Sequence, residues 1–307
     1  MKHILIHLKL IIVAAIWGLG WPAGRVLAAE MAPFAAAWLR YVVAIACFLV
    51  LLQVTNNWEL PTRGEWKRIA LIGFFSTVVY QAFFMFGMQY TAAGDASLMI
   101  TFNPFFTALL AIVFLDERMH WRLGTGLALG ISGVTILFLY SPNVDIPFNE
   151  RALGDLLIAA AAFSWACNSI LMKKAMTTPA PDATESMSPL HLTVWSSVVG
   201  FLLLTPVVAI ETWQVGLPDS NMNGWISLVF LAVFSTVISY VWFADGIRTI
   251  GAGKSALYVY LVPPFGIFSG WLLLDEKLGV PLLISFILIV GGVALAQSHK
   301  APAEEAS

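Results

Sequence analysis

The sequence predicts an all-α integral membrane protein whose ten transmembrane helices form two inverted five-helix repeats. Apolar residues make up 59 % of the chain and charged residues only 11 %, a balance outside the range of soluble domains. Apolar runs of about 20 residues, the length needed to cross a hydrocarbon core as a helix, recur along nearly the whole chain. Two similar segments, 159 residues apart, indicate an internal duplication.

The expected helices follow the apolar runs. They cover approximately residues 10–29, 33–54, 67–90, 93–115, 121–140, 152–175, 188–210, 222–246, 252–274 and 280–298. Unbroken apolar character indicates helices, because barrel strands are shorter and alternate apolar with polar residues. The first run is too long for the core of a signal peptide and is interpreted as the first membrane helix.

The duplication is clearest in three short motifs of the first half and their cognates in the second. Ala93–Ser97, Asn103-Pro104 and Asp116–Arg118 correspond to Ala252–Ala256, Val262-Pro263 and Asp275–Lys277. We therefore expect a first repeat at 1–140, an external linker at 141–151, a second repeat at 152–298 and a cytoplasmic tail at 299–307. Prolines that interrupt cognate helices of two membrane repeats point to a transport site.

Lysine and arginine predict the orientation. Twelve of the 16 fall in the termini and in the loops that share a side with them. The positive-inside rule then places both termini in the cytoplasm. The expected location of this multi-pass chain is the cytoplasmic (inner) membrane. Because each repeat has an odd number of helices, the two repeats must be inverted relative to each other.

Several short motifs match a known family. They are Trp17-Gly18, Trp38–Tyr41, Gln89–Ala96, Asn103-Pro104, Asp116–Arg118, Ser164-Trp165, Ile250–Ala252, Tyr260–Pro263 and Asp275–Lys277. On these residues the chain resembles the EamA-type transporters of the drug/metabolite transporter superfamily. The resemblance implies alternating access, a central cavity between helices of both repeats, and small organic metabolites as substrates. Export of amino acids or related compounds is the favoured activity on this analogy alone.

Candidate substrate-binding residues are polar or aromatic side chains on the expected cavity faces: Trp17, Tyr80, Gln81, Phe84, Asn103, Trp165, Asn168, Tyr240, Phe243 and Tyr258. A buried amide either binds the substrate or makes an interhelical hydrogen bond worth about 0.6–2 kcal/mol. The aromatic rings suit an apolar or aromatic substrate, or a cation over a ring face, with core packing as the alternative. We expect Asn103→Ala and Tyr240→Ala each to impair transport without unfolding the protein.

Four further residues have predicted roles in gating or charge. Pro104 and Pro263 are expected to bend their helices and to free the carbonyls of Ile100 and Val259, because proline has no backbone N–H. Arg40, the deepest charge, is predicted either to attract an anionic group or to have a structural role. Asp245 is predicted either to carry a coupling proton or to pair with a nearby base.

Other classes of protein fit less well. The five histidines lie near predicted helix ends and Cys47 and Cys167 lie inside helices, so neither an enzyme, a disulfide nor a metal site is predicted. No cofactor or nucleic acid is expected; the expected partners are a small-molecule substrate and membrane lipid. Substrate identity, coupling and oligomeric state stay open. The alternatives are export of nucleobases, sugars or cationic drugs, and a non-transporting membrane sensor or scaffold.

Overall fold

The structure is a computed structural model that describes residues 2–56, 58–114, 121–143, 145–250 and 257–297. All regular elements within these ranges are helical. Seven helical stretches there are long and apolar enough to cross a membrane, and shorter apolar helices cover Gly124–Tyr140, Val262–Leu274 and Val280–Gly292. The prediction of an all-helical chain with many apolar helices is confirmed. The predicted tail at 299–307 lies outside the described residues, as do the repeat motifs at 116–118 and 252–256.

The helices of the first half follow the apolar runs in order. They are α1 (Lys2–Glu30), α2 (Pro33–Val54), α3 (Arg63–Gly73) with the π-helix η1 (Phe74–Val79) and α4 (Tyr80–Tyr90), α5 (Ala93–Met99) with the 3-10 turn η2 (Ile100–Phe102) and α6 (Asn103–Phe114), and α7 (Trp121–Tyr140).

The second half repeats this order. Its helices are α8 (Phe148–Thr177), α9 (Pro189–Val215), α10 (Met222–Val229) with the π-helix η3 (Phe230–Ile238) and α11 (Ser239–Ile250), η4 (Leu257–Leu261) with α13 (Val262–Leu274), and α14 (Val280–Gln297). Helix α8 begins inside the predicted linker, at Phe148. Glu150 in its first turn stabilises this earlier start, because a carboxylate interacts favourably with a helix N-terminus.

The irregular turns also recur at matching places. The π-helices η1 and η3 overlap when the two halves are aligned, and both 3-10 turns directly precede a helix with proline at its second residue, Pro104 in α6 and Pro263 in α13. The carbonyl of Ile100, predicted to be free, instead accepts the backbone N–H of Asn103. The 3-10 turn therefore absorbs the break that Pro104 imposes.

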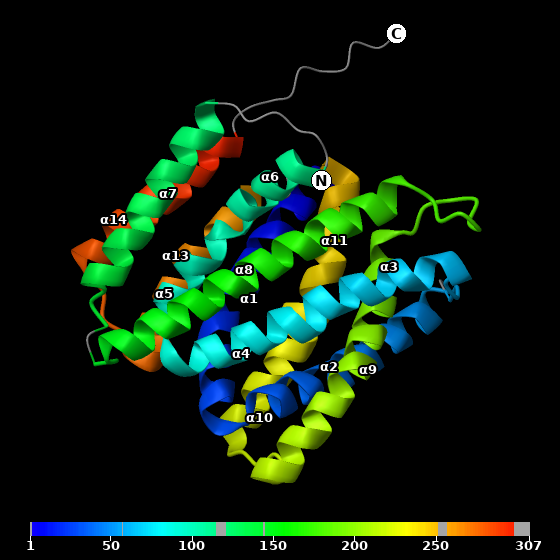
Figure 1. Ribbon diagram of the computed structural model, residues 1–307, viewed down its shortest axis with the longest axis horizontal. Helices are drawn as coiled ribbons and strands as arrows, with labels where there is room; N and C mark the ends of the chain where they lie inside the picture. Colours follow the sequence, from blue (N-terminus) through cyan, green and yellow to red (C-terminus); the bar gives the residue numbers. More distant parts are fainter. Residues whose placement is uncertain (1, 57, 115–120, 144, 251–256, 298–307) are drawn as a thin grey trace.

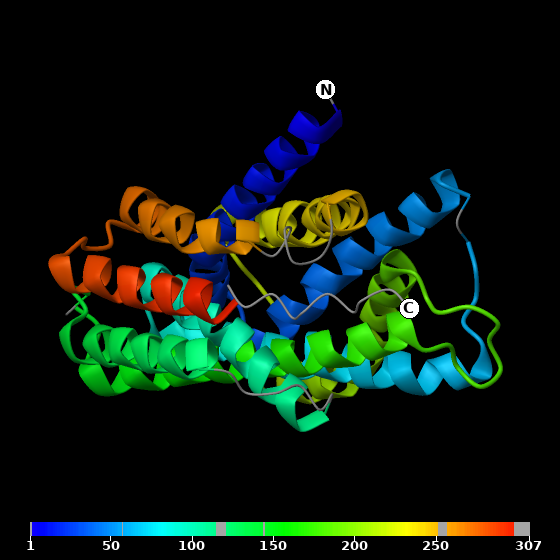
Figure 2. The same ribbon diagram turned by 90° about the horizontal axis from the view of Figure 1, so that it is seen from above.

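Helix α1 runs through the middle of the molecule and contacts α4, α5, α10, α11 and α13. Its first turns extend beyond the other helices (Figure 2). Helices α7 and α14 lie side by side at one edge (Figure 1). A Cβ atom at Gly18 would lie 2.3 Å from Cβ of Phe265, so glycine permits the close approach of α1 and α13 next to Trp17.

Candidate functional site

Seven aromatic side chains form a continuous chain of ring contacts in the interior. Along this chain the centroid distances are 5.5 Å (Trp21 to Phe84), 6.0 Å (Phe84 to Tyr80), 5.1 Å (Tyr80 to Trp165), 6.1 Å (Trp165 to Tyr240), 6.4 Å (Tyr240 to Trp17) and 5.3 Å (Trp17 to Phe243). We call these seven residues the aromatic cluster. Six of them were predicted as substrate-binding residues; Trp21 is the addition.

Local helix geometry explains how the cluster forms. Trp17 and Trp21 on α1, like Tyr80 and Phe84 on α4, are four residues apart, so each pair lies on one helix face. Trp17 is fixed further by its indole N–H, which donates to the carbonyl of Ser235 at 3.0 Å. Ser235 belongs to the π-helix η3. In an ordinary α-helix the Ser235 carbonyl would accept the backbone N–H four residues later, and a π-helix changes that pattern of hydrogen bonds.

Arg40 lies beside the aromatic cluster and joins the two halves of the chain. Its side chain is buried, and Nη2 donates to Oγ1 of Thr236 at 2.9 Å while Nη1 donates to Oε1 of Gln81 at 3.3 Å. Gln81 in turn donates to the hydroxyl of Tyr41 at 3.4 Å. Within the described ranges no carboxylate pairs with Arg40, and its Nε has no acceptor.

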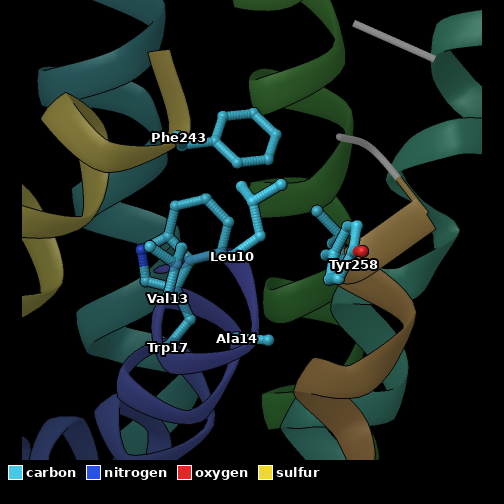
Figure 3. Close-up of a pocket in the computed structure, with 7 residues that line it drawn as sticks. Leu10, Val13, Ala14, Trp17, Phe243 and Tyr258 are labelled. Carbon is cyan, nitrogen blue, oxygen red and sulfur yellow. The ribbon is translucent and has the colours of Figure 1, made fainter. Parts of the chain in front are cut away.

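A small apolar gap, which we call the crevice, lies between α1 and two other segments next to the aromatic cluster and is too narrow to hold a water molecule. Figure 3 shows Leu10, Val13, Ala14 and Trp17 on α1, with Phe243 and Tyr258 coming from two other segments; Val259 completes the lining.

At the N-terminal end of this α1 segment, Tyr258 hydrogen-bonds Nδ1 of His7. Lys9 pairs with Asp245 at 2.9 Å in the same region, with both side chains about one-quarter exposed. These polar contacts lie at the N-terminal end of the α1 segment whose buried residues line the crevice.

Three other predicted residues, Asn103, Asn168 and Asp245, differ in their contacts. The amide of Asn103 donates to the carbonyl of Ala162 at 3.0 Å, which is the interhelical alternative. Asn168 is buried one turn from Trp165, and among described atoms its Oδ1 has no donor. Asp245 on α11 forms an ion pair with Lys9 on α1. The side chain of Arg248, the base considered from the sequence, lies outside the described residues.

A second polar region, absent from the predicted site, gathers where the chain turns between helices. Asp95 on α5 accepts from Ser141 Oγ at 2.6 Å and from Asn143 Nδ2 at 3.2 Å. Asp155 on α8 accepts from Thr91 Oγ1 at 2.5 Å. Both carboxylates are fully buried. With Arg151 and Glu276, these residues form what we call the loop-end cluster.

The cation of the loop-end cluster is Arg151, which is buried and donates to the carbonyls of Asn143 at 3.4 Å and Phe138 at 2.9 Å. It interacts electrostatically with both Asp95 and Asp155. A buried acid inside an apolar helix costs about 2.5–3.5 kcal/mol on insertion scales. That cost is the signal in the sequence that could have singled out both aspartates.

The side chain of Glu276 joins the second half of the chain to the first through hydrogen bonds. Its two carboxylate oxygens accept the N–H groups of Ala93 at 2.6 Å and Gly94 at 2.9 Å, at the start of α5. Glu276 therefore caps a helix of the other half of the chain. Burial raises the pKa of Glu276, while these two bonds and Arg25 oppose that shift.

No group of three or more histidine, cysteine or acidic residues in the described part of the chain has an arrangement that could hold a metal ion.

Comparison with known proteins gives consistent matches. The EamA-like transporter family matches residues 4–139 and again residues 152–297. "Uncharacterized transporter YyaM" of Bacillus subtilis (strain 168) is 25 % identical over 301 residues, 96 % of this chain and 94 % of that protein. A "Probable amino-acid metabolite efflux pump" of Escherichia coli (strain K12) is 29 % identical over 293 residues, 92 % of this chain and 91 % of that protein.

One protein of known crystal structure shares the fold, with a TM-score of 0.56 at 18 % identity over 92 % of this chain and 97 % of that chain. The resemblance predicted from the sequence motifs is confirmed by the two family matches. Together with the apolar helices, they show a multi-pass membrane protein. The names of the relatives indicate transporters rather than enzymes.

Proposed function

This chain belongs to the EamA-like transporter family of the drug/metabolite transporter superfamily, and we propose that it exports small organic metabolites by alternating access. Amino acids or related compounds are the proposed substrates. One relative is named as a probable amino-acid metabolite efflux pump, and its similarity over nearly the full length of both chains supports this choice.

The proposed architecture is ten membrane-spanning helices in two inverted repeats, at residues 1–140 and 152–298, with both termini in the cytoplasm. The recurrence of π-helices and 3-10 turns at matching places in the two halves supports the repeat. The Lys and Arg distribution supports the orientation. The cytoplasmic (inner) membrane is the proposed location.

The observation that carries the proposed function is a concentration of unpaired polar atoms around the aromatic cluster. Buried atoms without a hydrogen-bond partner, counted over the described residues, include Trp21 Nε1, Arg40 Nε, Asn168 Oδ1 and Ser235 Oγ. Buried polar groups in native proteins are nearly always paired, and exceptions call for an explanation. Binding of a polar solute among the aromatic rings would pair these donors and acceptors.

The loop-end cluster and the crevice support alternating access from opposite ends. In the loop-end cluster, side chains tie the turns α4–α5, α7–α8 and α13–α14 together, an arrangement suited to a closed face. The crevice along α1 lies toward the other end of the molecule, where both chain termini would lie, and it would have to widen for a solute to pass. The broken helices at Pro104 and Pro263 are the proposed bending points between the two states.

Counterflow in proteoliposomes tests the proposal. Vesicles that contain the purified protein are loaded in turn with neutral, aromatic, acidic and basic amino acids, with and without a pH gradient. Accumulation of one labelled class supports the proposed transport, and its response to the gradient reports coupling to protons. Accumulation of nucleobases, sugars or cationic drugs alone would contradict the proposed substrates. No accumulation of any solute by folded protein would favour the non-transporting alternative.

A further inference from the structure

Arg40 places a positive charge in the interior without a negative partner among the described residues. Only 7 % of its surface is exposed. The acceptors that it contacts, Gln81 Oε1 and Thr236 Oγ1, are uncharged. Removing an ion from water costs several kcal/mol even after relaxation. Two hydrogen bonds to neutral acceptors offset this cost only in part.

Arg151, a second buried cation, is neutralised in its own cluster. It interacts with Asp95 and Asp155, both buried close to it. Arg40 instead lies within electrostatic range of the phenol groups of Tyr80 and Tyr240. Those two rings belong to the aromatic cluster, so the charge of Arg40 acts on the region that contains the unpaired atoms.

We propose that Arg40 binds the carboxylate of the transported solute, which defines the substrate class as organic carboxylates with an apolar or aromatic body. The inference rests on the proposed function and deepens it. A guanidinium matches a carboxylate in geometry and charge. The rings of Tyr80, Trp165 and Tyr240 would pack against the body of the solute, and Gln81 would hold the guanidinium toward it.

The proposal separates two parts of an amino acid. Arg40 binds the carboxylate, while the described side chains of the aromatic cluster include no acid to pair with the ammonium group. Therefore the carboxylate is required for binding and the ammonium is dispensable. Three probes of similar shape distinguish these contributions: 3-phenylpropionate has only the carboxylate, phenethylamine has only the ammonium, and 3-phenylpropionamide is neutral.

The test measures binding of each probe to the purified full-length protein through tryptophan fluorescence, since Trp17 and Trp165 lie in the cluster, and through the melting temperature. We expect 3-phenylpropionate to bind at least about tenfold more tightly than the other two probes, because its carboxylate would form a buried charge pair with Arg40. Equal binding of 3-phenylpropionate and 3-phenylpropionamide by the unaltered protein would overturn the inference, without any variant being needed.

Two variants locate the effect at Arg40. Arg40→Gln should weaken 3-phenylpropionate at least about tenfold and leave 3-phenylpropionamide unchanged, and Arg40→Lys should restore part of the loss because it keeps the charge but not the planar fork. Arg122→Gln removes a charge at the start of α7 as a matched control and should change neither probe. A purely structural role for Arg40 would weaken both probes equally in Arg40→Gln, and that result would overturn the inference.

Failure of this inference is distinguishable from failure of the proposed function. If the vesicles accumulate phenethylamine or another amine and not 3-phenylpropionate, transport stands and the carboxylate assignment is wrong. If no solute is accumulated by folded protein, the proposed function itself fails.

Discussion

The loop-end cluster and the aromatic cluster both bury charge, but they differ in how that charge is paired. In the loop-end cluster, Asp95 and Glu276 have hydrogen bonds on both carboxylate oxygens, and Arg151 lies among the acids. Beside the aromatic cluster, the charge of Arg40 meets only neutral acceptors.

The unpaired atoms show the same contrast. Asp155 Oδ2 is the single unpaired oxygen of the loop-end acids, counted over the described residues, whereas four unpaired polar atoms lie in or near the aromatic cluster. A paired network fixes one arrangement of the chain, because each member is costly to leave unbonded. Unpaired polar atoms can still form hydrogen bonds with a ligand. We therefore assign stability mainly to the loop-end cluster and binding mainly to the aromatic cluster.

Among the variants that test this comparison, Arg151→Leu is expected to lose the most stability. The change removes the buried cation between Asp95 and Asp155, and loss of one partner from a buried charged network costs about 3–5 kcal/mol. The melting temperature in detergent should fall strongly, with loss of transport as a consequence of unfolding. Arg122→Leu is the control at an outer helix. An unchanged melting temperature for Arg151→Leu would show that the loop-end cluster does not stabilise the fold.

Tyr240→Ala should affect transport more than stability. It removes the ring that contacts both Trp17 and Trp165, so we expect counterflow to fall at least about tenfold, equivalent to ~1.4 kcal/mol of substrate binding. Asn103→Ala is the comparison, since its bond to Ala162 indicates a mainly structural role and a smaller loss of transport. Wild-type counterflow in Tyr240→Ala would remove this residue from the site.

Glu276→Gln tests the pH dependence of the loop-end cluster. Because burial raises the pKa of Glu276, the folded state binds the proton more tightly than the unfolded state. The contribution of Glu276 to the free energy of unfolding is therefore complete below its ordinary pKa and falls as the pH rises through the folded pKa. The uncharged Gln lacks this dependence.

Relative to Glu276→Gln, the melting temperature of the wild-type protein should fall as the pH rises above 4.5, the ordinary pKa of a glutamate. Melting curves of both proteins at several pH values measure the difference. A wild-type protein that gains stability over Glu276→Gln as the pH rises would contradict the raised pKa.

The smallest effect is expected at the Lys9–Asp245 ion pair, near the N-terminal end of α1. Lys9 and Asp245 are partly exposed, and such ion pairs typically contribute about 0.2–1 kcal/mol. A double-mutant cycle with Lys9→Met and Asp245→Asn should give a coupling energy in this range that decreases with added salt. A coupling energy above this range, or one that does not change with salt, would show that the Lys9–Asp245 pair is buried from solvent as well as the loop-end cluster is.

Regular periodicity made the aromatic cluster predictable. Six of its members were found because residues three or four apart share a helix face, and apolar runs gave the helices themselves. Trp21, four residues after Trp17, was left out of the predicted site. Its contact with Phe84 depends on how α1 and α4 pack, which spacing within one helix does not fix.

The loop-end cluster could not be assembled from spacing. Ser141 and Asp95 come together from different helix ends, and Glu276 reaches Ala93 across the two halves of the chain. The π-helices were missed for a similar reason: Phe74–Val79 has the composition of an ordinary apolar helix. In each case tertiary packing, rather than local sequence, determines the arrangement.

The most direct test of the central claim is substrate protection of a cysteine in the aromatic cluster. In a background without Cys47 and Cys167, Phe243→Cys lines the crevice and Asp145→Cys lies at the exposed edge of the loop-end cluster. The account predicts that the solute identified by counterflow slows maleimide modification of Phe243→Cys and leaves Asp145→Cys unaffected. Equal modification of Phe243→Cys with and without a transported solute would contradict the assignment of binding to the aromatic cluster.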